Sequence, residues 1–114
     1  MKDSSCRALD DLEDSVEQAA RLVSRGKPAW DADEFLRLAG EAVIHRIGEA
    51  VARLGRDDPE LVAAHPEISW RAMKGMRNVV AHQYGSIDHQ ILWNALAVSL
   101  PVEASRLRAI RPPE

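Results

Sequence analysis

The stretch RNVVAHQY, residues 77–84, combines side chains that could carry out acid–base chemistry on a phosphate. A histidine such as His82 can accept or donate a proton near neutral pH, and Arg77 offers a planar cation that binds phosphate oxygens in pairs. Asn78 could hold either the histidine or the phosphate, and Tyr84 is the chain's single tyrosine. The reaction that suits this set is metal-free cleavage of RNA, in which the 2′-hydroxyl attacks the adjacent phosphate and a fixed cation stabilises the developing charge.

The spacing of these residues decides which of them can meet, because residues 70–84 have the pattern of one helix. Positions seven apart return to within about 20° of one face, so Trp70, Arg77 and Tyr84 share a stripe. Asn78 and His82 are four apart and are neighbours. Arg77 and His82, five apart, diverge by about 140° on an ideal helix. They can share a ligand only if the helix end deforms, if the long arginine reaches around, or if a second chain completes the site.

A structural explanation of the same residues is also open. Arginine and histidine in the last turns of a helix complement its dipole in any protein. The ring of Tyr84 could lie on the core with its hydroxyl in water. An arginine and a histidine five apart are common in helical proteins, so spacing alone favours the structural explanation over catalysis.

The distribution of charge indicates where phosphate could bind. The 114 residues carry a net charge of −3, which argues against a general nucleic-acid coat. Residues 68–87, however, contain three basic residues and no acidic one. An anion could be admitted at this one place, and Arg71 and Lys74 are candidate contacts for RNA phosphate. A solvated helix face explains the charge alone equally well.

Length and composition indicate one domain over residues 1–114, with a frayed tail at residues 111–114. The single cysteine, Cys6, allows no intrachain disulfide, and no apolar run is long enough to cross a bilayer, so we expect a soluble cytoplasmic protein. No two of the four histidines are four residues apart, and there is no cysteine pair. We therefore expect neither a metal site nor a cofactor.

Apolar spacing predicts an all-α, up-and-down bundle of four main helices. The first should cover residues 4–25 and end at Gly26 and Pro28. The second should begin at Trp30 or Asp31, with Asp31 and Glu34 as a capping pair, and should continue to about residue 54. Its expected buried stripe consists of Phe35, Leu38, Ala42, Ile47 and Val51, with Ile44 and Leu54 beside it.

Glycines, caps and prolines predict further details of the bundle. Gly40 and Gly48 weaken a helix and are expected where another backbone approaches closely. A short helical turn should separate the second helix from the third, which Ser69 can cap and which should stop near residue 85. Asp88 should cap the last main helix, and Pro101 should kink or divide it.

Four short sequence motifs resemble those of a known family and occur in the order expected for it. They are IGEAV (residues 47–51), HPEISW (65–70), MRNVVAHQY (76–84) and the pair ID (87–88), and the ending LPVEASRL adds to the likeness. The family is the HepT-like family within the HEPN superfamily of small helical toxins, and the likeness covers about residues 30–107. R-x4-H alone is a weak signal, whereas R-N-x3-H-x-Y preceded by P-E-I-x-W and by G-E-A is a specific one.

The resemblance implies a helical bundle that pairs into a homodimer, with the motif lining a cleft at the interface. It implies a metal-independent endoribonuclease in which Arg77 and His82 are the catalytic pair and Asn78 is the polar residue after the arginine. HepT-like proteins are toxins of type VII-like toxin–antitoxin pairs. Their partner is a minimal nucleotidyltransferase antitoxin of the MntA type, which transfers AMP from ATP to the motif tyrosine, here Tyr84.

Two other functions remain open at the level of sequence. The bundle could be a non-enzymatic binding module that only docks the nucleotidyltransferase and supplies Tyr84 as its substrate. It could also be a helical adaptor without a site, in which Arg77 and His82 matter for stability alone. Toxicity of the chain expressed alone would support only the ribonuclease.

Overall fold

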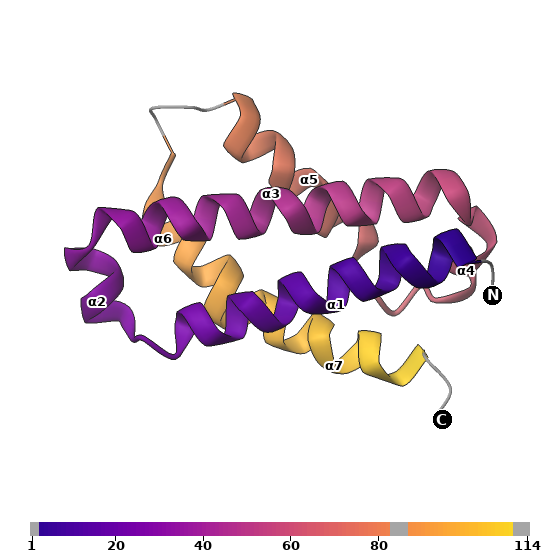
Figure 1. Ribbon diagram of the computed structural model, residues 1–114, viewed down its shortest axis with the longest axis horizontal. Coiled ribbons are helices and arrows are strands. Elements are labelled where there is room, and N and C mark those ends of the chain that lie inside the picture. The colour runs from indigo at the N-terminus through magenta and orange to yellow at the C-terminus, as the bar shows by residue number, and fades with distance from the viewer. Residues whose placement is uncertain (1–2, 83–86, 111–114) are drawn as a thin grey trace.

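Two long antiparallel helices, α1 (Asp3–Val23) and α3 (Glu34–Asp57), form the frame of the molecule (Figure 1). The structure is a computed structural model that describes residues 3–82 and 87–110, apart from the side chains of residues 79–82. The short helix α2 (Lys27–Ala32) connects α1 to α3, and α4 (Pro59–Ala64) follows α3 at its other end. This hairpin is the support on which the remaining helices pack.

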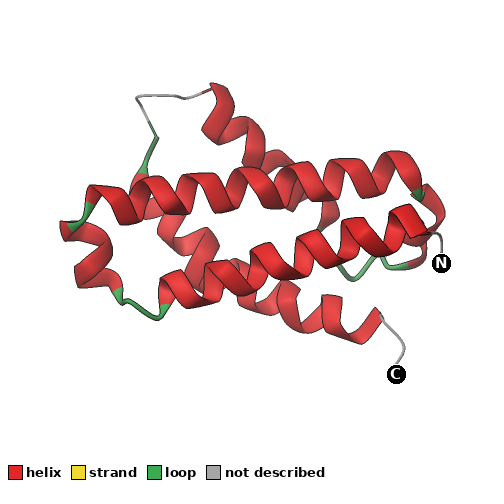
Figure 2. Cartoon of the chain, in the orientation of Figure 1, coloured by secondary structure: helices red, strands yellow, loops and turns green. Residues whose placement is uncertain are grey.

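The second half of the chain packs on the frame as two helical segments. Helix α5 (Trp70–His82) packs along α3. Helix α6 (His89–Asn94), the π-helical turn η1 (Ala95–Ser99) and α7 (Leu100–Ile110) follow one another, and η1 and α7 pack against α1. Every regular element in the described ranges is helical (Figure 2), so the predicted all-α bundle is confirmed.

One continuous core holds the helices together. Its fully buried large side chains come from both hairpin helices, from α2, from α5 and from the last helical segments. They are Leu9, Leu12, Trp30, Ile44, Ile47, Leu54, Met73, Leu96, Leu100 and Leu107. Because α5 contributes Met73 to this core, the helix that carries the motif is attached to the frame by apolar burial.

The predicted start of the second long helix was wrong, because a separate short helix precedes it. Gly26 has a φ of 90°, which favours glycine, and Pro28 lies in the first turn of α2. Asp31 therefore lies inside α2 and caps nothing. The cap of α3 is Asp33, whose side chain accepts hydrogen bonds from the backbone nitrogens of Phe35 (2.9 Å) and Leu36 (3.4 Å).

The predicted buried stripe of α3 was right at its C-terminal end and wrong at its N-terminal end. Ile47 and Val51 are buried, whereas Phe35 is 73% exposed and Leu38 is 53% exposed. The buried face runs through Gly40 and these two C-terminal residues. Phe35, Leu38 and the exposed Ala42 lie about 160–220° around the helix from Gly40, on the solvent side.

Two of the three glycines of α3 lie at close approaches to neighbouring side chains and backbone. A Cβ at position 48 would lie 2.5 Å from the Cβ of Arg77 and 3.1 Å from its backbone nitrogen. The predicted close backbone approach is confirmed there. At Gly40 the neighbour is a side chain instead, because a Cβ would lie 2.6 Å from the ring of Trp30.

The last main helix begins and divides as predicted. Asp88 caps α6, since its Oδ1 accepts hydrogen bonds from the backbone nitrogens of Gln90 (2.9 Å) and Ile91 (3.3 Å). The helix is divided by η1, in which the backbone N–H of Leu100 bonds to the carbonyl of Ala95, one residue further back than in an α-helix. The irregular turn lies just before Pro101, whose missing N–H and ring disturb the regular ladder.

Three predicted features can be compared only in part. The predicted short turn before the third helix is α4, and α5 begins directly after Ser69. The predicted stop near residue 85 and the frayed tail at residues 111–114 lie outside the described residues. No helix among the described residues has the length and apolar character needed to span a membrane.

The close contact between α3 and α5 predicts opposite effects for alanine at two glycines of the same helix. Gly48→Ala should lower the free energy of unfolding by about 1–3 kcal/mol, because the new methyl group overlaps Arg77. Gly55→Ala should raise it by about 0.5–1 kcal/mol, because nothing lies within 4 Å of that position and alanine favours helix. Urea unfolding followed by circular dichroism measures both, and equal effects of the two substitutions would contradict the packing described.

Candidate active site

Arg77 lies where α5 passes over α3, and two consecutive residues of α3 hold it there. Gly48 leaves the space for its Cβ and backbone, as described above. Its guanidinium Nη1 donates a hydrogen bond to Oε1 of Glu49 at 2.9 Å. The Arg77 side chain is 26% exposed and the Glu49 side chain 51% exposed, so the ion pair lies at the edge of the packed surface.

Asn78 and His82 follow Arg77 on α5 but do not lie on its side of the helix. Asn78 is exposed. The backbone of α5 remains α-helical as far as His82. No deformation of the helix between positions 77 and 82 therefore brings these two positions together. Positions 77 and 82 therefore diverge by about 140°. The side chain of His82 and the whole of Tyr84 lie outside the described part of the chain.

The two basic residues proposed from the charge pattern line one hollow beside the motif. Arg71 and Lys74 of α5 face it together with Arg56 of α3, and its volume is about 360 Å³. None of its lining residues is acidic; the other members are Val51, Ala52, Gly55, Val62 and Trp70. Lys74 is four residues before Asn78, so Asn78 follows the hollow by one turn on the same side of α5.

Sequence reasoning missed two residues of this region, Glu49 and Arg56, because both lie on α3. Glu49 lies in the motif IGEAV, which carries part of the family resemblance but suggested no role for this residue. Its signal was the glycine before it, since a glycine at a helix crossing brings the next residue close to the neighbouring helix. Arg56 gave no signal, because only the packing of α3 on α5 places it beside Arg71.

The N-terminal end of α5 is held by residues from two motifs of the sequence. The indole Nε1 of Trp70 donates to the carbonyl of His65 at 2.9 Å. The backbone N–H of Ser69 donates to Oε2 of Glu103 in α7 at 3.0 Å, and Glu103 is only 6% exposed. Arg106 pairs with the other oxygen of that carboxylate at 3.1 Å. Residues of the motifs HPEISW and LPVEASRL thus fix where α5 begins.

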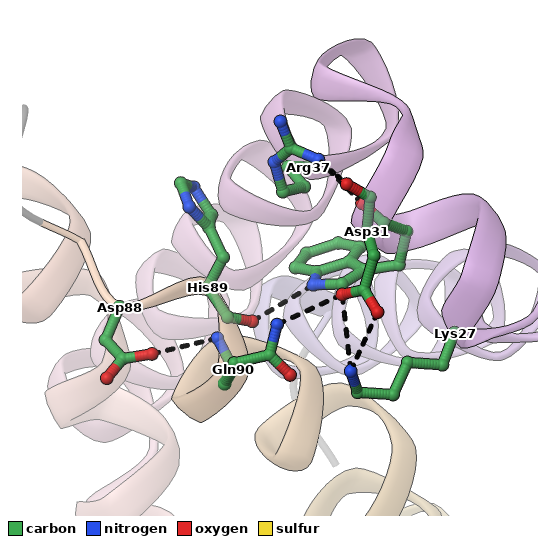
Figure 3. A network of polar contacts seen from close by, with 7 residues as sticks. Lys27, Asp31, Arg37, Asp88, His89 and Gln90 are labelled. Carbon is green, nitrogen blue, oxygen red and sulfur yellow. Dashed lines mark hydrogen bonds and ion pairs between the residues drawn. The ribbon is translucent and has the colours of Figure 1, made fainter.

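The chain that follows the motif is fastened at the start of α6, where Figure 3 shows the contacts. The indole Nε1 of Trp30 donates to the carbonyl of His89 at 3.0 Å. The amide of Gln90 donates to Asp31 at 3.0 Å, and Lys27 pairs with the same carboxylate at 2.9 Å. The hydrogen bond from Lys27, followed by that from Gln90, lowers the pKa of the Asp31 carboxyl. His89 also contacts Glu41 of α3 at 2.8 Å.

The arrangement can hold an anion. Arg71, Lys74 and Asn78 lie along one side of α5, and Arg56 of α3 lines the same hollow as Arg71 and Lys74. Within residues 3–82 and 87–110, no three histidine, cysteine or acidic side chains gather as a metal-binding group. A phosphate contacting the exposed edge of Arg77 would meet preorganised N–H donors, which is the arrangement that stabilises charge during phosphoryl chemistry.

The fold and this site define a small all-α bundle that presents a cationic motif helix to solvent. The family model described as "Ribonuclease HepT-like" matches residues 12–110, so the chain belongs to the HepT-like family, as the resemblance predicted. No solved structure gives a significant match to the chain.

Several curated proteins are similar to this chain over most of its length. The chain is 34% identical over 110 residues to "Probable ribonuclease HepT" of Thermococcus cleftensis, a match that covers 92% of this chain and 97% of the relative. A relative in Methanocaldococcus jannaschii is 30% identical over 95 residues, covering 79% of this chain and 84% of its own length. A third, in Caldanaerobacter subterraneus, is 28% identical over 103 residues, covering 87% and 89%. The names of the last two give them provisionally as RNases.

Proposed function

We propose that this protein is a metal-independent endoribonuclease, the toxin of a type VII-like toxin–antitoxin pair that acts in the cytoplasm. The observation that carries the proposal is Arg77, which α3 holds partly exposed three residues after Lys74. Lys74 and Arg71 line the basic hollow on the same helix. The ribonuclease names of its relatives support it. Arg77 and His82 are the catalytic pair, Asn78 assists them, and Arg71 and Lys74 bind RNA phosphate.

The reaction requires one proton to be removed and one to be supplied. A base takes the proton of the 2′-hydroxyl, the 2′-oxygen forms a bond to phosphorus, and the bond from phosphorus to the 5′-oxygen breaks. An acid gives its proton to that leaving oxygen. His82 serves these proton transfers, and the guanidinium of Arg77 stabilises the extra negative charge on the phosphate oxygens. The products are a 2′,3′-cyclic phosphate and a 5′-hydroxyl end.

A second copy of the chain completes the site in this proposal, with Arg77 of one protomer meeting His82 of the other. The divergence of about 140° between the two positions on a regular helix supports this arrangement. An uncharged helix face supports it as well. Residues 90–102 contain no charged residue, and Ile91, Val98 and Val102 are each at least half exposed.

That uncharged face begins beside the motif helix. Ile91 and Met76 line the same small hollow, whose lining is apolar except for Asp88, and Met76 is the residue before Arg77. An apolar face without charge can pair with its own copy across a two-fold axis, since no like charges then oppose each other. A homodimer formed there would carry both motif helices close to its interface.

Removing either member of the catalytic pair should abolish cleavage without unfolding the protein. We expect Arg77→Ala and His82→Ala to lower the turnover of an RNA oligonucleotide at least about 100-fold, because charge stabilisation or proton transfer is lost. The wild-type protein should keep its activity in EDTA. Gel assays of 5′-labelled RNA measure cleavage, and circular dichroism checks the fold.

The basic hollow provides the matched comparison for this experiment. Arg71→Ala and Lys74→Ala should raise KM for RNA and leave kcat within a few fold, because these residues contact phosphates away from the reacting bond. Equal cleavage by the wild type, Arg77→Ala and His82→Ala would refute the assignment. An unmodified wild-type protein that cuts no RNA in any of these assays would identify the bundle as a binding module instead.

We assign to Tyr84 the role of the residue whose modification switches off the ribonuclease activity. A nucleotidyltransferase antitoxin of the MntA type transfers AMP from ATP to its hydroxyl, with loss of pyrophosphate. The added nucleotide brings bulk and negative charge two residues from His82, where RNA phosphate must lie, and so excludes the substrate. The presence of the chain's single tyrosine within the motif supports this assignment.

Tyr84→Phe should keep ribonuclease activity and escape the antitoxin, because phenylalanine has no hydroxyl to modify. Incubation with the antitoxin, ATP and magnesium should add the mass of AMP to the wild-type chain and nothing to Tyr84→Phe. The cleavage assay is then repeated on both proteins. An antitoxin that silences Tyr84→Phe as fully as the wild type would show that inhibition does not depend on this hydroxyl.

A further inference from the structure

Glu49 makes the one contact that the described structure shows for the guanidinium of Arg77. Its carboxylate Oε1 lies 2.9 Å from Nη1 of the arginine. The two residues are 28 apart in the chain and come from different helices, so the contact exists only because α3 and α5 pack closely. We propose that Glu49 is a positioning residue for RNA cleavage, which fixes the guanidinium of Arg77 in the orientation that receives phosphate. This inference rests on the proposed function.

The geometry provides Arg77 with a support at both ends of its side chain. Gly48 fixes the root, because its missing side chain lets the Cβ and backbone of Arg77 come into contact with α3. Glu49, the next residue, holds the tip. A guanidinium has five N–H donors, so one bond from Nη1 leaves the others available for phosphate oxygens. An arginine bound at root and tip loses little further freedom when it meets its ligand.

Stability alone does not explain the pair. With Arg77 26% and Glu49 51% exposed, it is an ion pair near the surface, and such pairs contribute little to folding because water and salt screen them. The same helix contains a comparable ion pair, Arg53 with Asp11 of α1, whose side chains are 42% and 58% exposed. That pair joins α3 to α1 and not to the motif helix, so it provides a matched control.

The charge of Glu49 separates orientation from substrate binding. A carboxylate beside a phosphate site repels the substrate, so its removal should not weaken RNA binding. Loss of the support should instead slow the chemical step. Glu49→Ala should therefore lower kcat about 10- to 100-fold without raising KM. Glu49→Gln keeps a carbonyl oxygen that can accept the bond from Arg77, and it should restore kcat to within a few fold of the wild type.

The experiment is steady-state cleavage of an RNA oligonucleotide by the full chain in EDTA. It compares the wild type with Glu49→Ala, Glu49→Gln and the control Asp11→Asn, with circular dichroism and thermal unfolding on each. We expect the kcat loss in Glu49→Ala alone. An unchanged kcat in Glu49→Ala, or an equal loss in Asp11→Asn, overturns the positioning role.

A second measurement does not need catalysis. Relaxation of the ¹⁵Nε nucleus of Arg77 should show a rigid guanidinium in the wild type and in Glu49→Gln, and a mobile one in Glu49→Ala. If the wild type cleaves no RNA, the proposed function fails, and the relaxation data still report whether Glu49 holds Arg77. Equal mobility of Arg77 in the wild type and in Glu49→Ala overturns the inference whatever the activity.

Discussion

The crossing of α5 over α3 at Gly48 is the contact on which the site depends. A side chain larger than hydrogen at position 48 would overlap the Cβ of Arg77 at 2.5 Å. The absence of that side chain lets the arginine lie against α3, within reach of Glu49. The same close packing brings Arg56 of α3 to the hollow that Arg71 and Lys74 line. Gly48 therefore determines both how closely α5 packs on α3 and which charged side chains of the two helices come together.

The rest of the fold controls where the motif helix begins and where the chain goes after it. Buried Glu103 of α7 and the carbonyl of His65 hold the first residues of α5. Trp30 and Asp31 hold the first residues of α6 through His89 and Gln90. The described chain is thus fastened on both sides of residues 83–86. Such anchoring suits a site whose reacting groups must be positioned to within a fraction of an ångström.

Local signals in the sequence were sufficient to predict much of this fold. Ser69, Asp88 and Pro101 mark the start of α5, the start of α6 and the division before α7, because a cap or a proline acts within one turn. Gly48 predicted a close approach for another reason, because a residue without a side chain lets a second backbone come near. The start of α3 was mistaken because Asp31 and Asp33 both suit a cap, and only the separate helix α2 decides between them.

Features that arise through space could not be predicted in this way. The predicted stripe of α3 joined residues from two sides of the helix, and the spacing did not show that the side with Phe35 and Leu38 faces solvent. The Glu49 contact and the position of Arg56 follow from packing between helices. The charge pattern did select Arg71 and Lys74, which the structure places in one hollow, because both lie on the same helix as the motif.

The central claim is that one protomer supplies Arg77 and the other supplies His82, and a mixed dimer tests it most directly. An Arg77→Ala chain and a His82→Ala chain with different tags are co-expressed, and the heterodimer is purified and assayed for RNA cleavage. The account predicts cleavage at about half the wild-type rate, because one of the two sites related by the two-fold axis keeps both residues. Activity no higher than that of either parent homodimer would contradict the shared site, since a site within one chain is broken in both subunits.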